Sequence, residues 1–233
     1  MRAPVPVAHG LCPVGVKAVP HMYRQIPNLI TVGRLILTAA FFVALNQVPA
    51  RGTFAQWMWV CFAVFVVAGL TDVLDGYLAR SWKVESAFGR VVDPFVDKIL
   101  ICGAFVFLAS PDFLGPRAAL LGTASSAAAI TGIAPWMAVV LIAREFLVTG
   151  IRGLAESKGI DFRSQWTGKL KMFAQSFAVG AALGNLATAV HGGHYQPITW
   201  ILWSRNIAIW VTLATTVLSA LDYIVRSRKI MTD

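Results

Sequence analysis

The sequence predicts an all-α, polytopic integral membrane protein with six transmembrane helices and both termini in the cytoplasm. Of the 233 residues, 57% are hydrophobic and only 13% are charged, and the mean hydropathy is +0.68. A soluble domain of this size needs a larger charged surface. Apolar stretches long enough to cross about 30 Å of hydrocarbon recur along the chain. They lie at about 29–48, 53–71, 91–110, 130–151, 170–190 and 198–225.

Lysine and arginine are unevenly distributed among the connections between these stretches. They gather in the N-terminal tail (Arg2, Lys17, Arg24), the second connection (Arg80, Lys83, Arg90), the fourth (Arg152, Lys158, Arg163, Lys169) and the C-terminus (Arg226, Arg228, Lys229). The other three connections hold only Arg51, Arg117 and Arg205. The positive-inside rule therefore places both termini and the second and fourth connections in the cytoplasm.

The N-terminal segment differs in composition from the rest of the chain. Residues 1–21 hold several prolines and no apolar run, which predicts a disordered extension and not a cleavable signal. Residues 22–233 are expected to form a single membrane domain.

The net charge of +9 would suit nucleic acid, but the basic residues lie at the ends of apolar runs. Membrane lipids and phosphate-bearing substrates are therefore the expected partners, with no nucleic acid.

Four aspartates stand at helical spacings between the second and third apolar stretches. Asp72 and Asp75 are three residues apart, and Asp93 and Asp97 are four apart, so each pair shares one face of a helix. Carboxylates at membrane depth are costly and are kept mainly where they have a function. Four that converge would bind hard divalent cations, here Mg²⁺ or Mn²⁺, through oxygen. Two such ions about 4 Å apart can clamp a phosphoryl group.

The segment around these aspartates fits the pattern DxxDGxxARx8GxxxDxxxD at every fixed position. The fixed positions are Asp72, Asp75, Gly76, Ala79, Arg80, Gly89, Asp93 and Asp97. The pattern resembles the signature of the CDP-alcohol phosphotransferases, integral-membrane enzymes of phospholipid synthesis. Four further segments resemble the branch of that family that makes phosphatidylglycerophosphate. They are 26–38, 142–156, 166–175 and 213–224.

This resemblance implies a reaction, a place and an assembly. The reaction is phosphatidyl transfer from CDP-diacylglycerol to sn-glycerol 3-phosphate, giving phosphatidylglycerophosphate and CMP. The place is the bacterial cytoplasmic membrane, with the active site facing the cytoplasm, and the assembly is a homodimer. All four aspartates would bind the metal ions. By the same resemblance, Asp97 is also the catalytic base that deprotonates the acceptor hydroxyl.

The other motif residues suit a nucleotide substrate. Gly76 and Gly89 carry no side chain, so a pyrimidine or a phosphate could approach the backbone. Ala79 is small and lies about one turn beyond Gly76, while Arg80 offers a forked donor to the pyrophosphate. Because no Ser/His or Cys/His arrangement stands near these residues, direct attack by the acceptor alcohol is the simplest mechanism.

A second set of cations is expected to bind the acceptor phosphate. Arg144 lies well inside an apolar run, and Arg152 follows eight residues later on roughly the same face. Lys169 and Lys171 open the next apolar stretch, and Arg34, within the first stretch, is a weaker candidate. A phosphorylated acceptor such as glycerol 3-phosphate needs such cations. The competing interpretations are an ion pair between Arg144 and Glu145, and interfacial anchoring for Arg152 and Lys169.

Two alternative functions stay open at this stage. The first is another member of the same family, a cardiolipin or phosphatidylinositol-phosphate synthase, which would differ in the acceptor pocket. The second is a divalent-cation transporter whose carboxylates line a pathway. A transporter predicts acidic residues spread over several helices and both leaflets. The four aspartates gather instead at one predicted level, which disfavours transport.

Overall fold

The computed structural model describes residues 21–48, 53–82, 87–114, 126–158, 166–191 and 194–231. Within these ranges only the backbone is described for 21–28, 30, 72–82, 87–94, 156, 166–169, 191 and 228–231. The long helices are α1 (His21–Asn46), α2 (Phe54–Trp82), α3 (Ala87–Ala109), α6 (Pro135–Ser157), α7 (Trp166–Thr188) and α8 (Thr199–Met231). The short elements are α5 (Ala127–Thr131), β1 (Val190–His191) and β2 (His194–Tyr195). Residues 1–20, the bulk of the predicted disordered extension, lie outside the described residues.

Each apolar stretch of the sequence corresponds to one long helix, so the all-α prediction is confirmed. The fourth helix begins later than its apolar stretch, which starts at 130. Gly132 has φ of 78° and ends α5 in the left-handed conformation, and α6 then begins at Pro135. By length and hydropathy, Phe54–Thr71 of α2 and Thr199–Ser227 of α8 could each cross a membrane. The full set of six spans stays a prediction.

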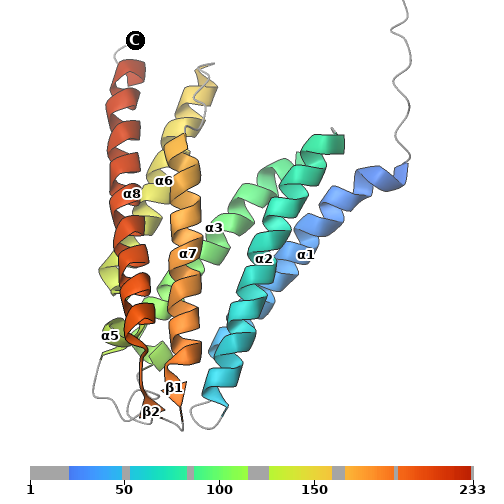
Figure 1. The fold of residues 1–233 in the computed structure, drawn as a ribbon. Coiled ribbons are helices and arrows are strands. Elements are labelled where there is room, and N and C mark those ends of the chain that lie inside the picture. The colour runs from blue at the N-terminus through green and yellow to red at the C-terminus, as the bar shows by residue number, and fades with distance from the viewer. Residues whose placement is uncertain are drawn as a thin grey trace, which may run out of the picture.

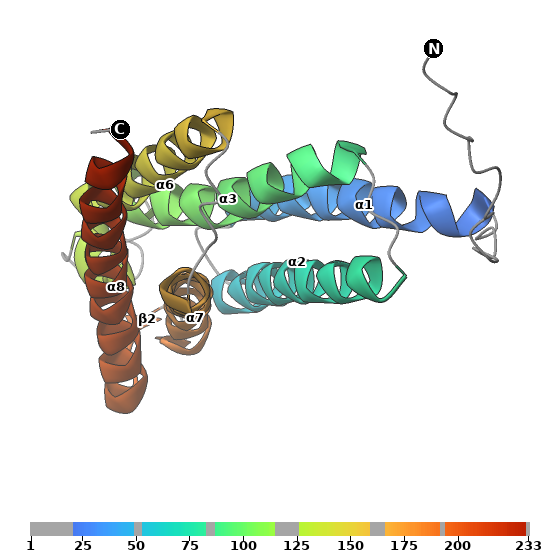
Figure 2. The ribbon, with the colours of Figure 1, turned by 90° about the horizontal axis from the view of Figure 1, so that it is seen from above.

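The long helices contact one another in a closed ring. In order, α1 contacts α2, α2 contacts α7, α7 contacts α8, α8 contacts α6, α6 contacts α3, and α3 returns to α1 (Figure 2). The first residues of α1 and the last residues of α8 lie at one end of the bundle (Figure 1). The short helix α5 and the hairpin of β1 and β2 lie at the opposite end. Side chains that point inward from all six helices can therefore meet.

The apolar part of the ring interior follows the helical period. In α2 the buried residues are Phe54, Met58, Cys61, Phe65 and Ala68, which recur every three or four positions and so form one face. They pack with buried side chains of the other helices into one hydrophobic cluster. This face extends over the first half of α2, on the hairpin side of the aspartates.

Helix α8 is polar inside and apolar outside. Its buried face carries Arg205, Thr212, Thr216, Ser219, Tyr223 and Ser227 together with the apolar Ala208, Ile209 and Leu213. Its exposed face carries Trp200, Trp203, Ile207, Trp210, Leu218, Leu221 and Val225. In water this arrangement would be unfavourable, because the apolar face would stay hydrated. A hydrocarbon surrounding favours it, since the polar groups then find partners only within the protein.

A polar network closes the hairpin end of the ring. The buried Arg205 guanidinium donates to the Ile130 carbonyl and, at 3.2 Å, to Asn185 Oδ1. The Tyr195 hydroxyl donates to the same Asn185 oxygen at 3.2 Å. Burial raises the pKa of the Tyr195 hydroxyl, so it remains a proton donor at neutral pH. The network ties α5, α7, the hairpin and α8 together.

Gly132 is the backbone position on which this closure depends. A Cβ at Gly132 would lie 2.9 Å from Arg205 Nε and 2.9 Å from Ile209 Cδ1, and its φ of 78° disfavours other residues. We expect Gly132→Ala to lower the free energy of unfolding by about 1–3 kcal/mol. The measurement is thermal unfolding of the purified protein in detergent.

The matched control for this substitution is Gly150→Ala on α6. Gly150 lies within a helix, and a Cβ there meets nothing within 4 Å. Alanine is the better helix former, so Gly150→Ala should leave the melting temperature unchanged or raise it slightly. Equal melting temperatures for the two variants would show that Gly132 does not limit the closure.

Candidate active site

The motif residues divide between two helices that meet at one end of the bundle. Helix α2 carries Asp72, Asp75, Gly76, Ala79 and Arg80, and helix α3 carries Gly89, Asp93 and Asp97. Helix α2 ends at Trp82 and α3 begins at Ala87, so only four residues join them. The two aspartate pairs are therefore close to the same end, where α1 begins and α8 ends (Figure 1). Because both segments are helical, each pair occupies one face of its helix.

Asp97 is the one aspartate of this motif whose side chain lies within the described residues. It is half-buried. The charges that act on its carboxylate belong to Arg34 of α1, Lys171 of α7, Glu145 of α6 and the neighbouring Lys98. Arg34 is itself 1% exposed. Charged groups from four helices thus surround the ring interior at the level of Asp97.

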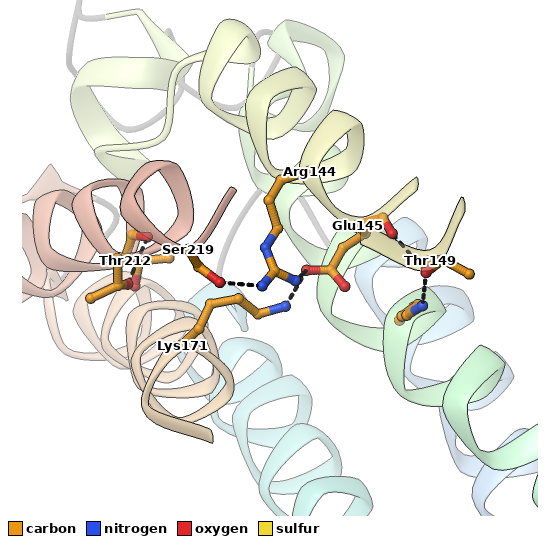
Figure 3. A network of polar contacts seen from close by, with 8 residues as sticks. Arg144, Glu145, Thr149, Lys171, Thr212 and Ser219 are labelled. Atoms are coloured by element: carbon orange, nitrogen blue, oxygen red, sulfur yellow. Dashed lines mark hydrogen bonds and ion pairs between the residues drawn. The ribbon is translucent and has the colours of Figure 1, made fainter. Parts of the chain in front are cut away.

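The polar contacts beside Asp97 centre on Glu145. Arg144 Nη1 donates to Glu145 Oε1 at 3.2 Å, and Lys171 Nζ donates to the same oxygen. Figure 3 shows the Arg144 guanidinium and the Lys171 amine next to each other, both directed at the Glu145 carboxylate. Arg144 and Lys171 are 7% and 4% exposed, so two buried cations share one carboxylate in a medium where charge is poorly solvated.

Helix α8 completes the surroundings of Arg144. Its Nη2 donates to Ser219 Oγ at 2.5 Å, and the guanidinium carbon lies 5.7 Å from the centre of the Tyr223 ring. That distance allows a cation–π interaction. Arg144 therefore links α6 to α8, while Glu145 links α6 to α7. On the far side of Glu145, Lys98 Nζ of α3 donates to Thr149 Oγ1 of α6 at 2.5 Å.

Arg144 and Arg152, two of the residues predicted to bind the acceptor phosphate, lie in different surroundings. Arg144 lies in the network just described, and its ion pair with Glu145, the competing interpretation, is present. Arg152 is exposed, because eight residues in a helix with 3.6 residues per turn rotate the side chain by about 80°. For Lys169, and for Asp72, Asp75, Gly76, Ala79, Arg80, Gly89 and Asp93, the structure describes the backbone alone.

Sequence reasoning did not assign Glu145, Ser219 or Tyr223 to the site, and it named Lys171 only as a neighbour of Lys169 at the start of an apolar stretch. Glu145 had a weak signal as the neighbour of Arg144. Ser219 and Tyr223 had none, because a serine or tyrosine in an apolar helix is unremarkable until its neighbours are known.

The donor set of the motif suits a divalent cation. Two carboxylates three apart on α2 and two carboxylates four apart on α3 provide oxygen ligands from two helices at one end of the bundle. Among the side chains that the structure describes, no group of three metal-ligating residues comes together, and three of the four aspartates are not among those side chains. The expectation that these residues bind a divalent cation therefore rests on where the four aspartates lie along α2 and α3.

Comparison with known proteins identifies the family. The family model described as CDP-alcohol phosphatidyltransferase matches residues 24–218. A Bacillus subtilis protein named CDP-diacylglycerol–glycerol-3-phosphate 3-phosphatidyltransferase is 28% identical over 85% of this chain and 93% of its own length. Proteins of the same name from Cereibacter sphaeroides and Haemophilus influenzae are 29% and 27% identical, each over 87% of this chain and over 95% and 93% of their own lengths. Because the family model covers most of its length, the chain belongs to the CDP-alcohol phosphatidyltransferase family.

Proposed function

We propose that this protein transfers the phosphatidyl group of CDP-diacylglycerol to sn-glycerol 3-phosphate, giving phosphatidylglycerophosphate and CMP. The observation that carries the choice of acceptor is the pair of buried cations, Arg144 and Lys171, at the level of Asp97. Such a pair suits a phosphorylated acceptor better than an uncharged alcohol. The names of the relatives from Bacillus subtilis, Cereibacter sphaeroides and Haemophilus influenzae agree with it.

In this proposal Asp72, Asp75, Asp93 and Asp97 hold Mg²⁺ or Mn²⁺, with two ions in the site. Ions held there would supply positive charge that offsets the charge of the pyrophosphate and of the departing CMP. Arg80 adds a forked donor to the pyrophosphate from the last turns of α2. Gly76, Ala79 and Gly89 leave room for the cytidine and its phosphates. These roles follow from the family motif and from the positions of its residues on α2 and α3.

The chemical step is a direct attack by a hydroxyl of the acceptor. Its oxygen forms a bond to the phosphorus that carries diacylglycerol, and the bond from that phosphorus to the bridging oxygen breaks. CMP leaves with the bonding electrons, and Asp97 accepts the hydroxyl proton. The half-buried position of Asp97 suits a general base, because the carboxylate is partly shielded from water yet borders the ring interior.

Charge balance explains how the cations could hold the acceptor phosphate. Arg144 and Lys171 carry two positive charges and share one carboxylate, Glu145. An entering phosphate dianion would balance the excess and form charge-assisted hydrogen bonds. Arg152 and Lys169, which lie nearer than Arg144 and Lys171 to the connection between α6 and α7, would attract the phosphate before it reaches the buried pair. Arg144 and Lys171 would then bind it beside Asp97.

The membrane setting follows from the same proposal. All six long helices would cross the bacterial cytoplasmic membrane, with both termini and the aspartates at the cytoplasmic face. Diacylglycerol would remain in the lipid while its phosphates reach α2 and α3, and glycerol 3-phosphate would enter from the cytoplasm. The enzyme would work as a homodimer, as the family resemblance implies.

Metal removal is the first test of this proposal. Chelation should abolish release of CMP from CDP-diacylglycerol, and added Mg²⁺ or Mn²⁺ should restore it. Asp75→Asn should lower turnover by at least about two orders of magnitude, since it removes a charged ligand. Asp112→Asn, which changes an exposed carboxylate beyond the end of α3, serves as the control. Full turnover in buffer shown to be free of divalent metal would remove the ions from the mechanism.

Asp97→Asn tests the base separately from nucleotide binding. We expect turnover to fall by about 10²–10⁴-fold, because the amide cannot accept the proton. Binding of CDP-diacylglycerol, measured by equilibrium titration, should fall much less. If both quantities fall equally, Asp97 acts mainly as a metal ligand; if turnover is nearly normal, it is not the base.

Arg144→Ala tests the acceptor pocket. The KM for glycerol 3-phosphate should rise by about one to two orders of magnitude, because a charge-assisted contact to the phosphate is lost. The KM for CDP-diacylglycerol should change little, whereas Arg80→Ala should show the reverse pattern. Arg226→Ala on α8 is the control, since Arg226 is 42% exposed and pairs with Asp222. If Arg144→Ala alters only the CDP-diacylglycerol curve, the pocket has been assigned to the wrong substrate.

A further inference from the structure

Gln175 is a buried polar residue that has no role in the proposed reaction as described so far. It lies on α7 four residues after Lys171, so the two side chains share a face. They are 3% and 4% exposed. Within the part of the chain that the structure describes, Gln175 Nε2 has no hydrogen-bond partner. A buried donor without a partner is unfavourable, which indicates that another molecule supplies the acceptor atom.

The pairing of α7 with α8 shows what lies opposite Gln175. At the hairpin end Asn185 meets Arg205, and near the site Lys171 and Ser219 both join the Arg144–Glu145 network. Fourteen residues separate the two points on each helix, and both helices rise equally per residue. Gln175 therefore lies at the level of Thr215 and Thr216 of α8. This level is about one helical turn closer to the hairpin end than Lys171 and Ser219.

Two further polar atoms in this region are, like Gln175 Nε2, buried without a hydrogen-bond partner in the described part of the chain. Arg144 Nε and Thr216 Oγ1 are buried and have no hydrogen-bond partner among the described residues. Arg144 uses its other two nitrogens on Glu145 and Ser219, so its remaining donor is free for a ligand. Beside the shared carboxylate there is thus a small polar region, composed mainly of donors, between α6, α7 and α8.

A ligand that satisfies this region must bring oxygen acceptors next to a bound anion. Inorganic phosphate would satisfy only the cations. A phosphorylated polyol carries both the anion and hydroxyl oxygens one or two carbons away, which matches a donor one helical turn from Lys171. In glycerol 3-phosphate the terminal hydroxyl is the less hindered nucleophile. Its C2 hydroxyl is then the group that remains for recognition.

We propose that Gln175 is a specificity-determining residue that donates a hydrogen bond from Nε2 to the C2 hydroxyl of the phosphorylated acceptor. This inference rests on the proposed function, because it requires glycerol 3-phosphate to occupy the region beside Arg144 and Lys171. It goes further by assigning recognition of the carbon skeleton to a neutral residue. The cations then bind phosphate, and Gln175 distinguishes among the alcohols that carry it.

The test compares two acceptors on three proteins. The acceptors are glycerol 3-phosphate and 3-hydroxypropyl phosphate, which keeps the phosphate and the terminal hydroxyl but lacks the C2 hydroxyl. The proteins are the unmodified chain, Gln175→Met and Thr212→Val. Methionine keeps the length of glutamine without its donor. Thr212 is a buried threonine of α8 with an unpartnered Oγ1, and it lies about one helical turn beyond the level of Gln175, on the side away from Arg144 and Lys171.

The expected result is a loss of selectivity in one variant only. The unmodified protein should prefer glycerol 3-phosphate over the analogue by about tenfold or more in kcat/KM. Gln175→Met should use both acceptors equally well, with its loss confined to glycerol 3-phosphate and its KM for CDP-diacylglycerol unchanged. Thr212→Val should keep the preference of the unmodified protein.

Other outcomes overturn the inference in distinguishable ways. If Gln175→Met keeps the preference for glycerol 3-phosphate, a buried water and not the acceptor satisfies Nε2, and the proposed function stands. If the unmodified protein releases no CMP with either acceptor, the proposed function and this inference both fail. If Gln175→Met does not fold, Gln175→Asn replaces it, because the shorter amide withdraws the donor and should also lose the preference.

Discussion

A carboxylate shared between two buried cations holds the site half of the bundle in place. Glu145 pairs with Arg144 of its own helix and with Lys171 of α7, and Arg144 extends the chain of contacts to Ser219 of α8. Removing one partner from such a buried group leaves an uncompensated charge, which typically costs about 3–5 kcal/mol. The positions of α6, α7 and α8 relative to one another therefore depend on this group as much as on apolar packing.

The same group makes the interior of the ring chemically useful. The carboxylate of Asp97 on α3 interacts with the charges of Arg34 on α1, Lys171 on α7 and Glu145 on α6, so opposite charges alternate across the bundle from α1 to α6. Each charge lowers the cost of burying its neighbour. A bundle closed only by leucine and phenylalanine could not keep a carboxylate and several cations together at this depth. The apolar cluster toward the hairpin end supplies the rigidity, and the charged level supplies the chemistry.

Much of the fold could be predicted from the sequence, because long apolar runs leave few alternatives to helices. The positions of the motif on α2 and α3 also followed, since spacings of three and four residues have one meaning within a helix. The start of α6 at Pro135 did not follow, because the left-handed conformation of Gly132 interrupts a continuous apolar run. Among the described residues, α2 and α8 each contain a segment long and apolar enough to cross a membrane, and crossing by all six helices stays a prediction.

The residues around the acceptor region were harder to predict, for a geometric reason. Arg144 and Arg152 look equivalent in the sequence, yet a rotation of about 80° between them leaves one buried and the other exposed. The partnership of Glu145 with Lys171 spans 26 positions and depends on which helices are neighbours. Helix order around the ring cannot be read from apolar runs alone. Local spacing therefore predicted the motif, whereas the cation network required the tertiary structure.

The polar inner face of α8 has a consequence for biosynthesis. This helix leaves the ribosome after the other five long helices, and Arg205, Thr212, Thr216 and Ser219 are all buried in the bundle. Left alone in lipid, these groups would lack partners. Helices α1, α2, α3 and α7 already contact one another without α8, but Arg144 lacks Ser219 and Tyr223 until α8 docks. Docking of α8 is thus the step that completes the surroundings of Arg144, so a chain interrupted before α8 would carry the entire aspartate motif without an assembled acceptor region.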